Sequence, residues 1–226
     1  MDPTPDYDRI ARPYRFLEWL AFGSTLQEAR TAFLKDLVPR RSILILGEGD
    51  GRFIQELTQH SLKGSIVVVE PSRSMIRLAE RRLSDEARSR VAFFTDDIRL
   101  WSPPKDSLPF DALVTLFFWD QYPPEEQESI VTRLQPWLQP GAAWLFADFS
   151  ETRPKKFPQA FARDFALRAL YRFFQRTTGI PARFIHDPCP FFMRFGWSRK
   201  RRASWKNEWI QSDLWIKNNF DKPVRG

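Results

Sequence analysis

Residues 42–51 read SILILGEGDG, a short unbroken apolar run followed at once by glycines at every second position. An apolar run of this length is typical of a β-strand that is covered on both faces, as in a parallel sheet. Gly47, Gly49 and Gly51 allow a tight turn and a close approach of the main chain to a ligand. Residues 52–62 then place apolar side chains at helical spacing. The stretch therefore predicts a strand, a glycine turn and the start of a helix.

The alternation of strand and helix continues along the chain. Further apolar runs that predict strands cover residues 65–69, 91–95, 111–118 and 142–149. Between them Ser72 can cap one helix, and the glutamates after Pro123 and Pro124 favour the first turn of another. This rhythm is typical of βαβ units, so we expect an α/β fold with a mostly parallel sheet and helices on both faces.

The chain is expected to form a single domain over residues 1–226. Both ends of the chain and a segment near residue 160 break the strand–helix rhythm, and a long amphipathic helix is predicted at 157–175. The predicted parts are an N-terminal helical lid (1–40), a ligand-binding core (41–150), an inserted helical cap (151–196) and a C-terminal hairpin that completes the sheet (197–226).

The composition is that of a basic folded protein, with a formal charge of +7 and a sequence pI of about 9.8. Such a balance favours an anionic partner: nucleic acid, a lipid surface or an acidic small molecule. Cys189 is the single cysteine, which excludes an internal disulfide and a cysteine-rich metal site, so no bound metal is expected. No apolar run approaches the roughly 18 residues of a membrane-spanning helix. Residues 1–8 are acidic and contain proline, unlike a secretory signal, so we expect a cytoplasmic protein.

The glycine turn departs from that of dinucleotide-binding folds. A dinucleotide-binding turn reads G-x-G-x-x-G, whereas here the spacing is G-x-G-x-G and Arg52 occupies the place of the third glycine. No phosphate-binding lysine follows the turn. A compact turn of this kind suits a nucleoside with a zwitterionic tail, and S-adenosylmethionine is such a ligand.

Acidic residues follow the next two predicted strands. Glu70 ends the second strand, where a carboxylate can accept both hydroxyls of a ribose. Asp96 and Asp97 follow the third strand, where an acid can accept from an adenine amino group while Ile98 packs on the ring. Because these positions follow successive strands, we expect them to surround one ligand.

Three further short motifs accompany these elements. Phe110-Asp111-Ala112 opens the fourth strand, residues 138–142 read LQPGA before the fifth, and residues 7–11 read YDRIA. Together with the glycine turn and the acids, they make residues 40–150 resemble class I S-adenosylmethionine-dependent methyltransferases, of the UbiE-like and general methyltransferase-domain kind. The resemblance implies a Rossmann-like seven-stranded sheet with an antiparallel last strand, and S-adenosylmethionine as cofactor.

The resemblance also implies which residues bind the cofactor. They are Tyr7, Gly47, Glu48, Gly49, Asp50, Gly51, Glu70, Pro71, Met75, Asp96, Asp97, Ile98 and Phe117. One position departs from the pattern, because members usually carry Asp or Glu two residues before the first glycine and this chain has Ile45. Two alternatives stay open: Glu48 or Asp50 replaces that acid at the methionine end, or the affinity for the cofactor is low.

Methyl transfer from a sulfonium depends mainly on positioning, and it needs a base only if the acceptor must lose a proton. The resemblance places the acceptor after the fourth strand. The catalytic candidates are therefore Asp120 and Tyr122, with His186 from the predicted cap. Trp119 and Asp148 are further residues to consider there, whereas His60 on the first core helix is expected to be structural.

The predicted function is methyl transfer to a small-molecule or lipid-like acceptor, because the added segments are rich in aromatic residues. Nucleic-acid methylation, of RNA in particular, is the alternative that the basic run at 199–202 suggests, with Trp197 and Trp205 beside it. The same run also suits an edge strand protected by charge, or a weak contact with an anionic membrane. A non-catalytic S-adenosylmethionine-binding protein is the alternative that Ile45 suggests.

Overall fold

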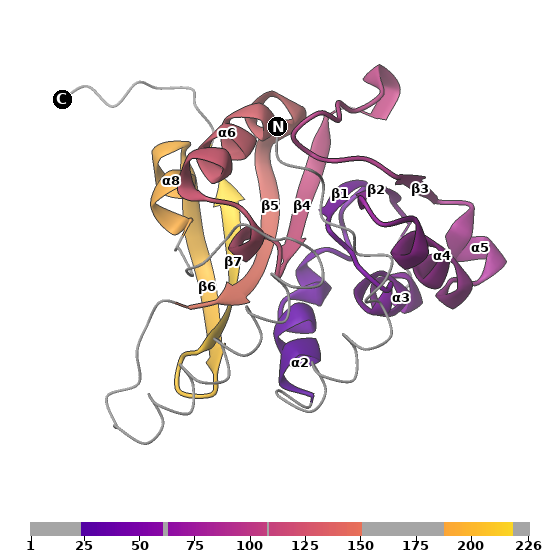
Figure 1. Cartoon of the computed structure of the whole chain (residues 1–226), viewed down its shortest axis with the longest axis horizontal. Helices are drawn as coiled ribbons and strands as arrows, with labels where there is room; N and C mark the ends of the chain where they lie inside the picture. The colour runs from indigo at the N-terminus through magenta and orange to yellow at the C-terminus, as the bar shows by residue number, and fades with distance from the viewer. Residues whose placement is uncertain (1–23, 61–62, 108, 151–187, 219–226) are drawn as a thin grey trace.

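The computed structural model describes residues 24–60, 63–107, 109–150 and 188–218. In these residues seven strands form one sheet in the order β3-β2-β1-β4-β5-β7-β6 (Figure 1). Strand β7 runs antiparallel to both of its neighbours, and β1 to β5 pair in parallel. The predicted α/β fold and the antiparallel last strand are confirmed. The strands are β1 (Ser42–Leu46), β2 (Ser65–Val69), β3 (Val91–Phe94), β4 (Phe110–Leu116), β5 (Leu138–Phe149), β6 (Trp197–Trp205) and β7 (Ile210–Lys217).

Helices connect the strands as the rhythm of the sequence predicts. They are α2 (Thr25–Thr31), η2 (Leu34–Asp36), α3 (Arg52–Gln59), α4 (Arg73–Arg82), α5 (Asp85–Arg88), η3 (Lys105–Ser107), η4 (Trp119–Gln121), α6 (Pro124–Leu134), η5 (Gln135–Trp137) and α8 (Cys189–Arg194). Ser72 caps α4, since its hydroxyl accepts from the Met75 N–H at 3.2 Å. Proline occupies the first turn of α6, as expected. Within the described ranges, no helix is both long and apolar enough to cross a membrane.

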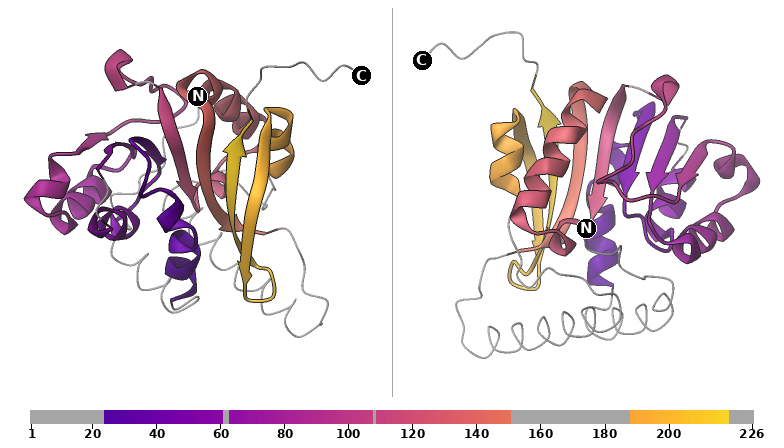
Figure 2. Two further views of the ribbon diagram at one scale, coloured as in Figure 1. Left: turned by 180° about the vertical axis from the view of Figure 1, so that it is seen from behind. Right: turned by 45° about the horizontal axis from the view of Figure 1, so that its top comes forward.

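Alternate residues of the central strands enter two separate apolar cores. Leu44 and Leu46 of β1 face the side that carries α6 and α8. Ile43 and Ile45 face the side that carries η2 and α3. The views in Figure 2 show these helices on opposite sides of the strands. The unbroken apolar run of β1 is therefore explained by burial on both faces.

Helix α2 lies at the carboxyl edge of the sheet. Its residues Leu26 and Ala29 pack with Phe149 at the end of β5 and Ile210 at the start of β7. This helix and η2 are the described parts of the predicted lid. Most of residues 1–40 and 151–196 lies outside the described residues, so the division into lid, core and cap stays a prediction.

Among the predicted strands of residues 42–149, two have a boundary that differs from the predicted one by more than one residue. Strand β4 ends at Leu116 instead of Phe118, because Phe117 has a φ of 55° and leaves the extended conformation. Strand β5 begins at Leu138 instead of Ala142, and a register shift between Phe110 and Ala112 of β4 accommodates the extra length.

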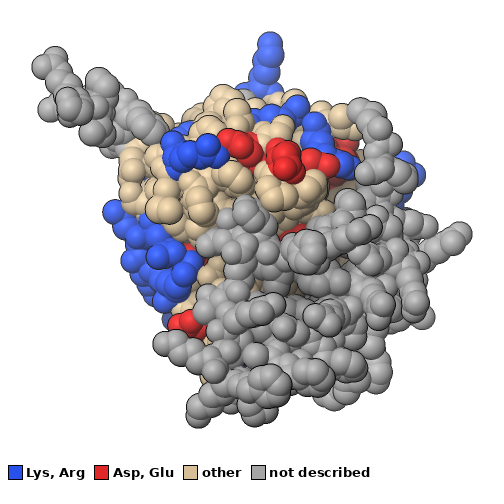
Figure 3. Space-filling view, turned by 60° about the vertical axis from the view of Figure 1, so that its left-hand side comes forward, with Lys and Arg blue, Asp and Glu red and all other residues tan. Residues whose placement is uncertain are grey.

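The basic run lies on β6, which forms one edge of the sheet. Figure 3 shows Lys and Arg side chains gathered on one side of the molecule. A register shift between Arg199 and Arg201 leaves Lys200 as an extra residue, so the expected alternation of faces is interrupted. Arg199 and Arg202 both reach the buried carboxylate of Asp213, at 3.7 and 2.6 Å. Arg201 lies on the other face, where it pairs with Asp36 at 3.0 Å. The three arginines of the run therefore make ion pairs within the molecule.

The ion pair between Arg202 and Asp213 leads to a prediction about stability. We expect Arg202→Met to lower the free energy of unfolding by about 1–3 kcal/mol, because Asp213 is fully buried and loses its nearest cation. Lys200→Met, in the bulge of the same strand, should change it by less than about 0.5 kcal/mol. Urea denaturation measures both values. Equal losses in the two variants would contradict the assignment.

Candidate active site

The glycine turn between β1 and α3 is held against the end of β2, since the Gly47 N–H donates to the carbonyl of Val69 at 2.9 Å. A side-chain carbon at Gly47 would lie 2.9 Å from the Phe118 ring, and one at Gly51 would lie 2.3 Å from Ala79 of α4. Gly49 differs, because a carbon there would meet no heavy atom of the described chain within 4 Å. Close packing thus explains why glycine is needed at positions 47 and 51. At Gly49 the space in front of the turn is open.

Glu70 lies beside Gly49 at the carboxyl end of β2. Its Oε2 accepts from the Gly49 N–H at 3.1 Å, and its Oε1 accepts from the Ser72 N–H at 3.0 Å. The residue is buried. Two main-chain donors therefore fix the orientation of a carboxylate at the position predicted for a ribose-binding acid. Pro71 and Met75 follow it, at the turn into α4 and in its first turn.

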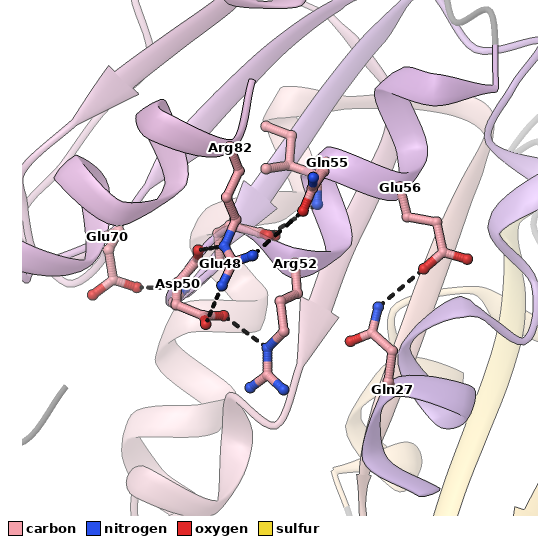
Figure 4. A network of polar contacts seen from close by, with 10 residues as sticks. Gln27, Glu48, Asp50, Arg52, Gln55, Glu56, Glu70 and Arg82 are labelled. Atoms are coloured by element: carbon pink, nitrogen blue, oxygen red, sulfur yellow. Dashed lines mark hydrogen bonds and ion pairs between the residues drawn. The ribbon is translucent and has the colours of Figure 1, made fainter. Parts of the chain in front are cut away.

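Asp50 is held by two arginines (Figure 4). Its carboxylate pairs with Arg52 and with Arg82 of α4, each at 3.0 Å. Arg82 Nε also donates to the main-chain carbonyl of Asp50 at 2.7 Å. This clamp fixes the turn to α4. Sequence reasoning did not identify Arg82, because its partner lies 32 residues away and no local pattern marks the pair.

Glu48 lies in the same turn in a different environment. Its Oε1 accepts from the Ile54 N–H in the first turn of α3 at 2.9 Å. Its Oε2 is buried and has no hydrogen-bond partner among the described residues. Burial raises the pKa of Glu48 to about 8, although the hydrogen bond from Ile54 and the charge of Arg30 oppose the shift.

The two acids after β3 differ from each other. The carboxylate of Asp97 is engaged by Arg99, with the closest contact at 2.6 Å, and Arg99 also reaches Glu126. Asp96 is exposed and accepts from the Asp97 N–H. Ile98 is buried beside Trp101. Of the two acids, Asp96 is thus the more accessible.

Asp120 and Asp148 lie at the carboxyl ends of neighbouring strands. Asp148, near the end of β5, accepts from the N–H groups of Trp119 and Phe149 at 3.0 and 2.8 Å. Burial raises the pKa of Asp148 well above its usual range, and the charge of Asp120 raises it further. Burial also raises the pKa of Asp120 to about 7.

The other candidates have more limited roles. Burial raises the pKa of Tyr122, so its hydroxyl stays protonated and is a poor base. Trp119 is a core residue whose indole N–H donates to Thr115 at 3.1 Å. Phe117 lies next to the Phe149 ring, with the Arg30 guanidinium 4.9 Å from its own ring. Tyr7 and His186 lie outside the described residues, and His60 is exposed at the end of α3.

Comparison with known proteins agrees with this geometry. A family described as "Methyltransferase domain" matches residues 43–141, which run from β1 into β5. Residues 43–141 of this chain therefore form a methyltransferase domain. The match includes the glycine turn, Glu70, the acids after β3 and Asp120.

This chain is similar to a curated protein, the malonyl-[acyl-carrier protein] O-methyltransferase of Paenibacillus sp. (strain JDR-2). The two are 27% identical over 122 residues, which cover 53% of this chain and 43% of the relative. The chain thus spans less than half the length of that relative.

Solved structures share the fold at low sequence identity. Magnesium protoporphyrin IX methyltransferase from Synechocystis PCC 6803, with bound SAH, has a TM-score of 0.63 at 14% identity, covering 93% of this chain and 97% of that one. The N-methyltransferase NodS from Bradyrhizobium japonicum WM9, in complex with S-adenosyl-l-homocysteine, has a TM-score of 0.58 at 16% identity, covering 90% and 97%.

The residues of the turn fit S-adenosylmethionine, the cofactor of this family. Gly49 leaves the main chain open to a ligand, and Glu70 is oriented beside it. Glu48 adds a buried carboxyl oxygen that has no hydrogen-bond partner among the described residues. An open main chain, a fixed acid and an unsatisfied acceptor together suit a nucleoside that carries an amino-acid tail.

The open space at Gly49 gives a test of the cofactor site. We expect Gly49→Leu to abolish binding of S-adenosylhomocysteine, because the side chain would fill the space in front of the turn. Gly141→Leu is a matched control, since Gly141 also has a positive φ and open space around it but lies in β5. Isothermal titration calorimetry measures binding. Equal loss in both variants would point to backbone strain instead.

Glu70 gives a second test. We expect Glu70→Ala to weaken binding of S-adenosylhomocysteine by about 1–3 kcal/mol, because ribose hydroxyls lose a charged acceptor. The same calorimetry measures the change. Tight binding of NAD by the unaltered protein, without binding of S-adenosylhomocysteine, would contradict the assignment.

Proposed function

We propose that this protein transfers the methyl group of S-adenosylmethionine to a small-molecule acceptor whose accepting atom must lose a proton. The observation that carries the proposal is the position of Asp120 relative to the glycine turn. Strands β1 and β4 are parallel neighbours, so the turns that follow them lie side by side. Phe118 packs against Gly47, and Asp120 is two residues further on.

Asp120 supports this chemistry as a general base. Its pKa of about 7 means that a large fraction is ionised at neutral pH while it still binds a proton well, which suits a base. Asp148 accepts from the N–H of Trp119, the residue before Asp120, so we assign it the role of a positioning residue. S-adenosylmethionine supplies an electrophilic methyl group, and Asp120 takes the proton that the acceptor releases.

The acids also bear on the choice of acceptor. The carboxyl group of Asp120, which is partly ionised at neutral pH, repels an anionic acceptor and favours a neutral hydroxyl or amine. The name of the curated relative gives a malonyl group as the acceptor of that protein. We therefore do not propose a malonyl group as the acceptor of this chain. The proposed acceptor is a neutral small molecule or a lipid-like compound with such a group.

The ion pairs of β6 argue against nucleic acid as the acceptor. Arg199, Arg201 and Arg202 each pair with an acid of the same chain. Binding phosphates would require these pairs to weaken or break. A gel-shift with tRNA and duplex DNA at several salt concentrations tests this alternative, since phosphate contacts give a steep loss of affinity with salt.

The experiment that tests the proposed function follows transfer of label from methyl-labelled S-adenosylmethionine to a library of neutral alcohols, phenols and amines. The control library holds carboxylic acids and RNA. Transfer to a neutral compound supports the proposal, and transfer confined to the control library contradicts the proposed acceptor class. Binding of the cofactor without transfer to any compound would favour a non-catalytic binding protein.

The pKa of Asp120 gives a prediction about pH dependence. The base works when ionised, so kcat/KM should rise with pH up to about 7 and then level off. Asp120→Asn should lower kcat by about 10²–10⁴-fold and remove this rise, because the amide cannot take a proton. Glu125→Gln, on the exposed first turn of α6, is the control. A pH profile that keeps its shape in Asp120→Asn would show that another group is the base.

A further inference from the structure

The position that usually carries an acid in this family is apolar here. Ile45 is 1% exposed and packs in the same core as Phe53 and Ile54 of α3. No charge can therefore come from this point of β1. The amino-acid end of the cofactor needs another acceptor.

Glu48 brings a carboxyl group to the same region from the turn. Its Oε1 binds the N–H of Ile54, whose side chain packs with Ile45. Its Oε2 is buried, and no donor of the described chain reaches it. A buried polar group without a partner costs about 1–3 kcal/mol, and once it has lost its proton this oxygen can accept from a donor on a ligand.

We propose that Glu48 binds the α-ammonium group of S-adenosylmethionine and releases its own proton when the cofactor binds. This inference rests on the cofactor of the proposed function, and it is independent of the acceptor. The ammonium group gains a charged hydrogen bond, and the proton of the Glu48 carboxyl group goes to the buffer.

The surroundings of the turn favour Glu48 over Asp50 for this role. Asp50 is already paired with Arg52 and Arg82, so its charge is compensated within the chain. The charges that face Glu48 are Arg30 of α2, Asp50 in the turn and Glu70 at the end of β2. Burial raises the pKa of Glu48 by more than the charge of Arg30 lowers it, and the charges of Asp50 and Glu70 raise it further. In the free protein Glu48 is therefore largely protonated at pH 7. A bound cation reverses this balance.

The test compares two ligands that differ at the methionine end. S-adenosylhomocysteine carries the ammonium group, and 5′-methylthioadenosine has the same adenosine thioether without the amino-acid part. Glu48→Gln keeps an oxygen that accepts from the Ile54 N–H but removes the charge. We expect it to weaken binding of S-adenosylhomocysteine about ten- to hundredfold and to leave 5′-methylthioadenosine within about twofold.

Asp50→Asn serves as the comparison variant. Because Asp50 clamps the turn to α4, its loss should weaken both ligands to a similar extent. The contrary result is that Asp50→Asn, and not Glu48→Gln, removes the preference for S-adenosylhomocysteine over 5′-methylthioadenosine. Asp50 would then be the acceptor of the ammonium group, and the inference would be wrong.

Proton release gives a second readout. Calorimetry at pH 7 in buffers of different ionisation enthalpy should show release of up to one proton when the unaltered protein binds S-adenosylhomocysteine. Binding of 5′-methylthioadenosine, and any binding by Glu48→Gln, should release almost none. Absence of release in the unaltered protein overturns the inference while leaving the proposed function intact. Failure of the unaltered protein to bind S-adenosylhomocysteine would overturn the proposed function itself.

Discussion

The turn after β1 is fixed to the neighbouring strand by main-chain hydrogen bonds, and the whole candidate site depends on this attachment. The Gly47 N–H binds the carbonyl of Val69 at the end of β2, and the Gly49 N–H binds the carboxylate of Glu70, the next residue. Both bonds require β1 and β2 to pair in their observed parallel register. The glycines make such bonds possible because the turn runs through positive φ. The sheet thus sets the distance between the open main chain and the acid beside it.

Buried and half-buried acids lie at this edge of the sheet, and their surroundings differ. Asp50 is compensated by arginines and stiffens the turn. Glu48 and Asp120 lie in places where burial raises their pKa to about 8 and about 7. Groups perturbed in this way cluster at functional sites, because an acid that holds a proton near neutral pH can exchange it with a ligand. Glu48 lies in the turn itself. Asp120 follows β4, the strand that pairs with β1.

The basic character of the chain has a structural explanation in part. Strand β6 is an edge strand, and exposed edges are commonly protected by charged side chains. Its arginines are exposed by 38 to 55% at the side chain while they pair with acids of the same chain. Arg201 also lies 4.5 Å from the centre of the Phe33 ring. A positive net charge therefore does not by itself identify an anionic partner for this protein.

The sequence by itself determined the order of strands and helices, the cap at Ser72, the glycine turn and the acid at Glu70. These features are local, since each depends on the period of apolar residues or on residues a few positions apart. The tertiary structure alone decided which acid of the turn is compensated, because Arg82 reaches Asp50 across 32 residues. It also placed Asp120 beside Asp148 from separate strands, and it set Arg199 and Arg202 on one face through the bulge at Lys200. Contacts of this kind join residues that are distant in sequence, and they leave no periodic pattern from which they could have been predicted.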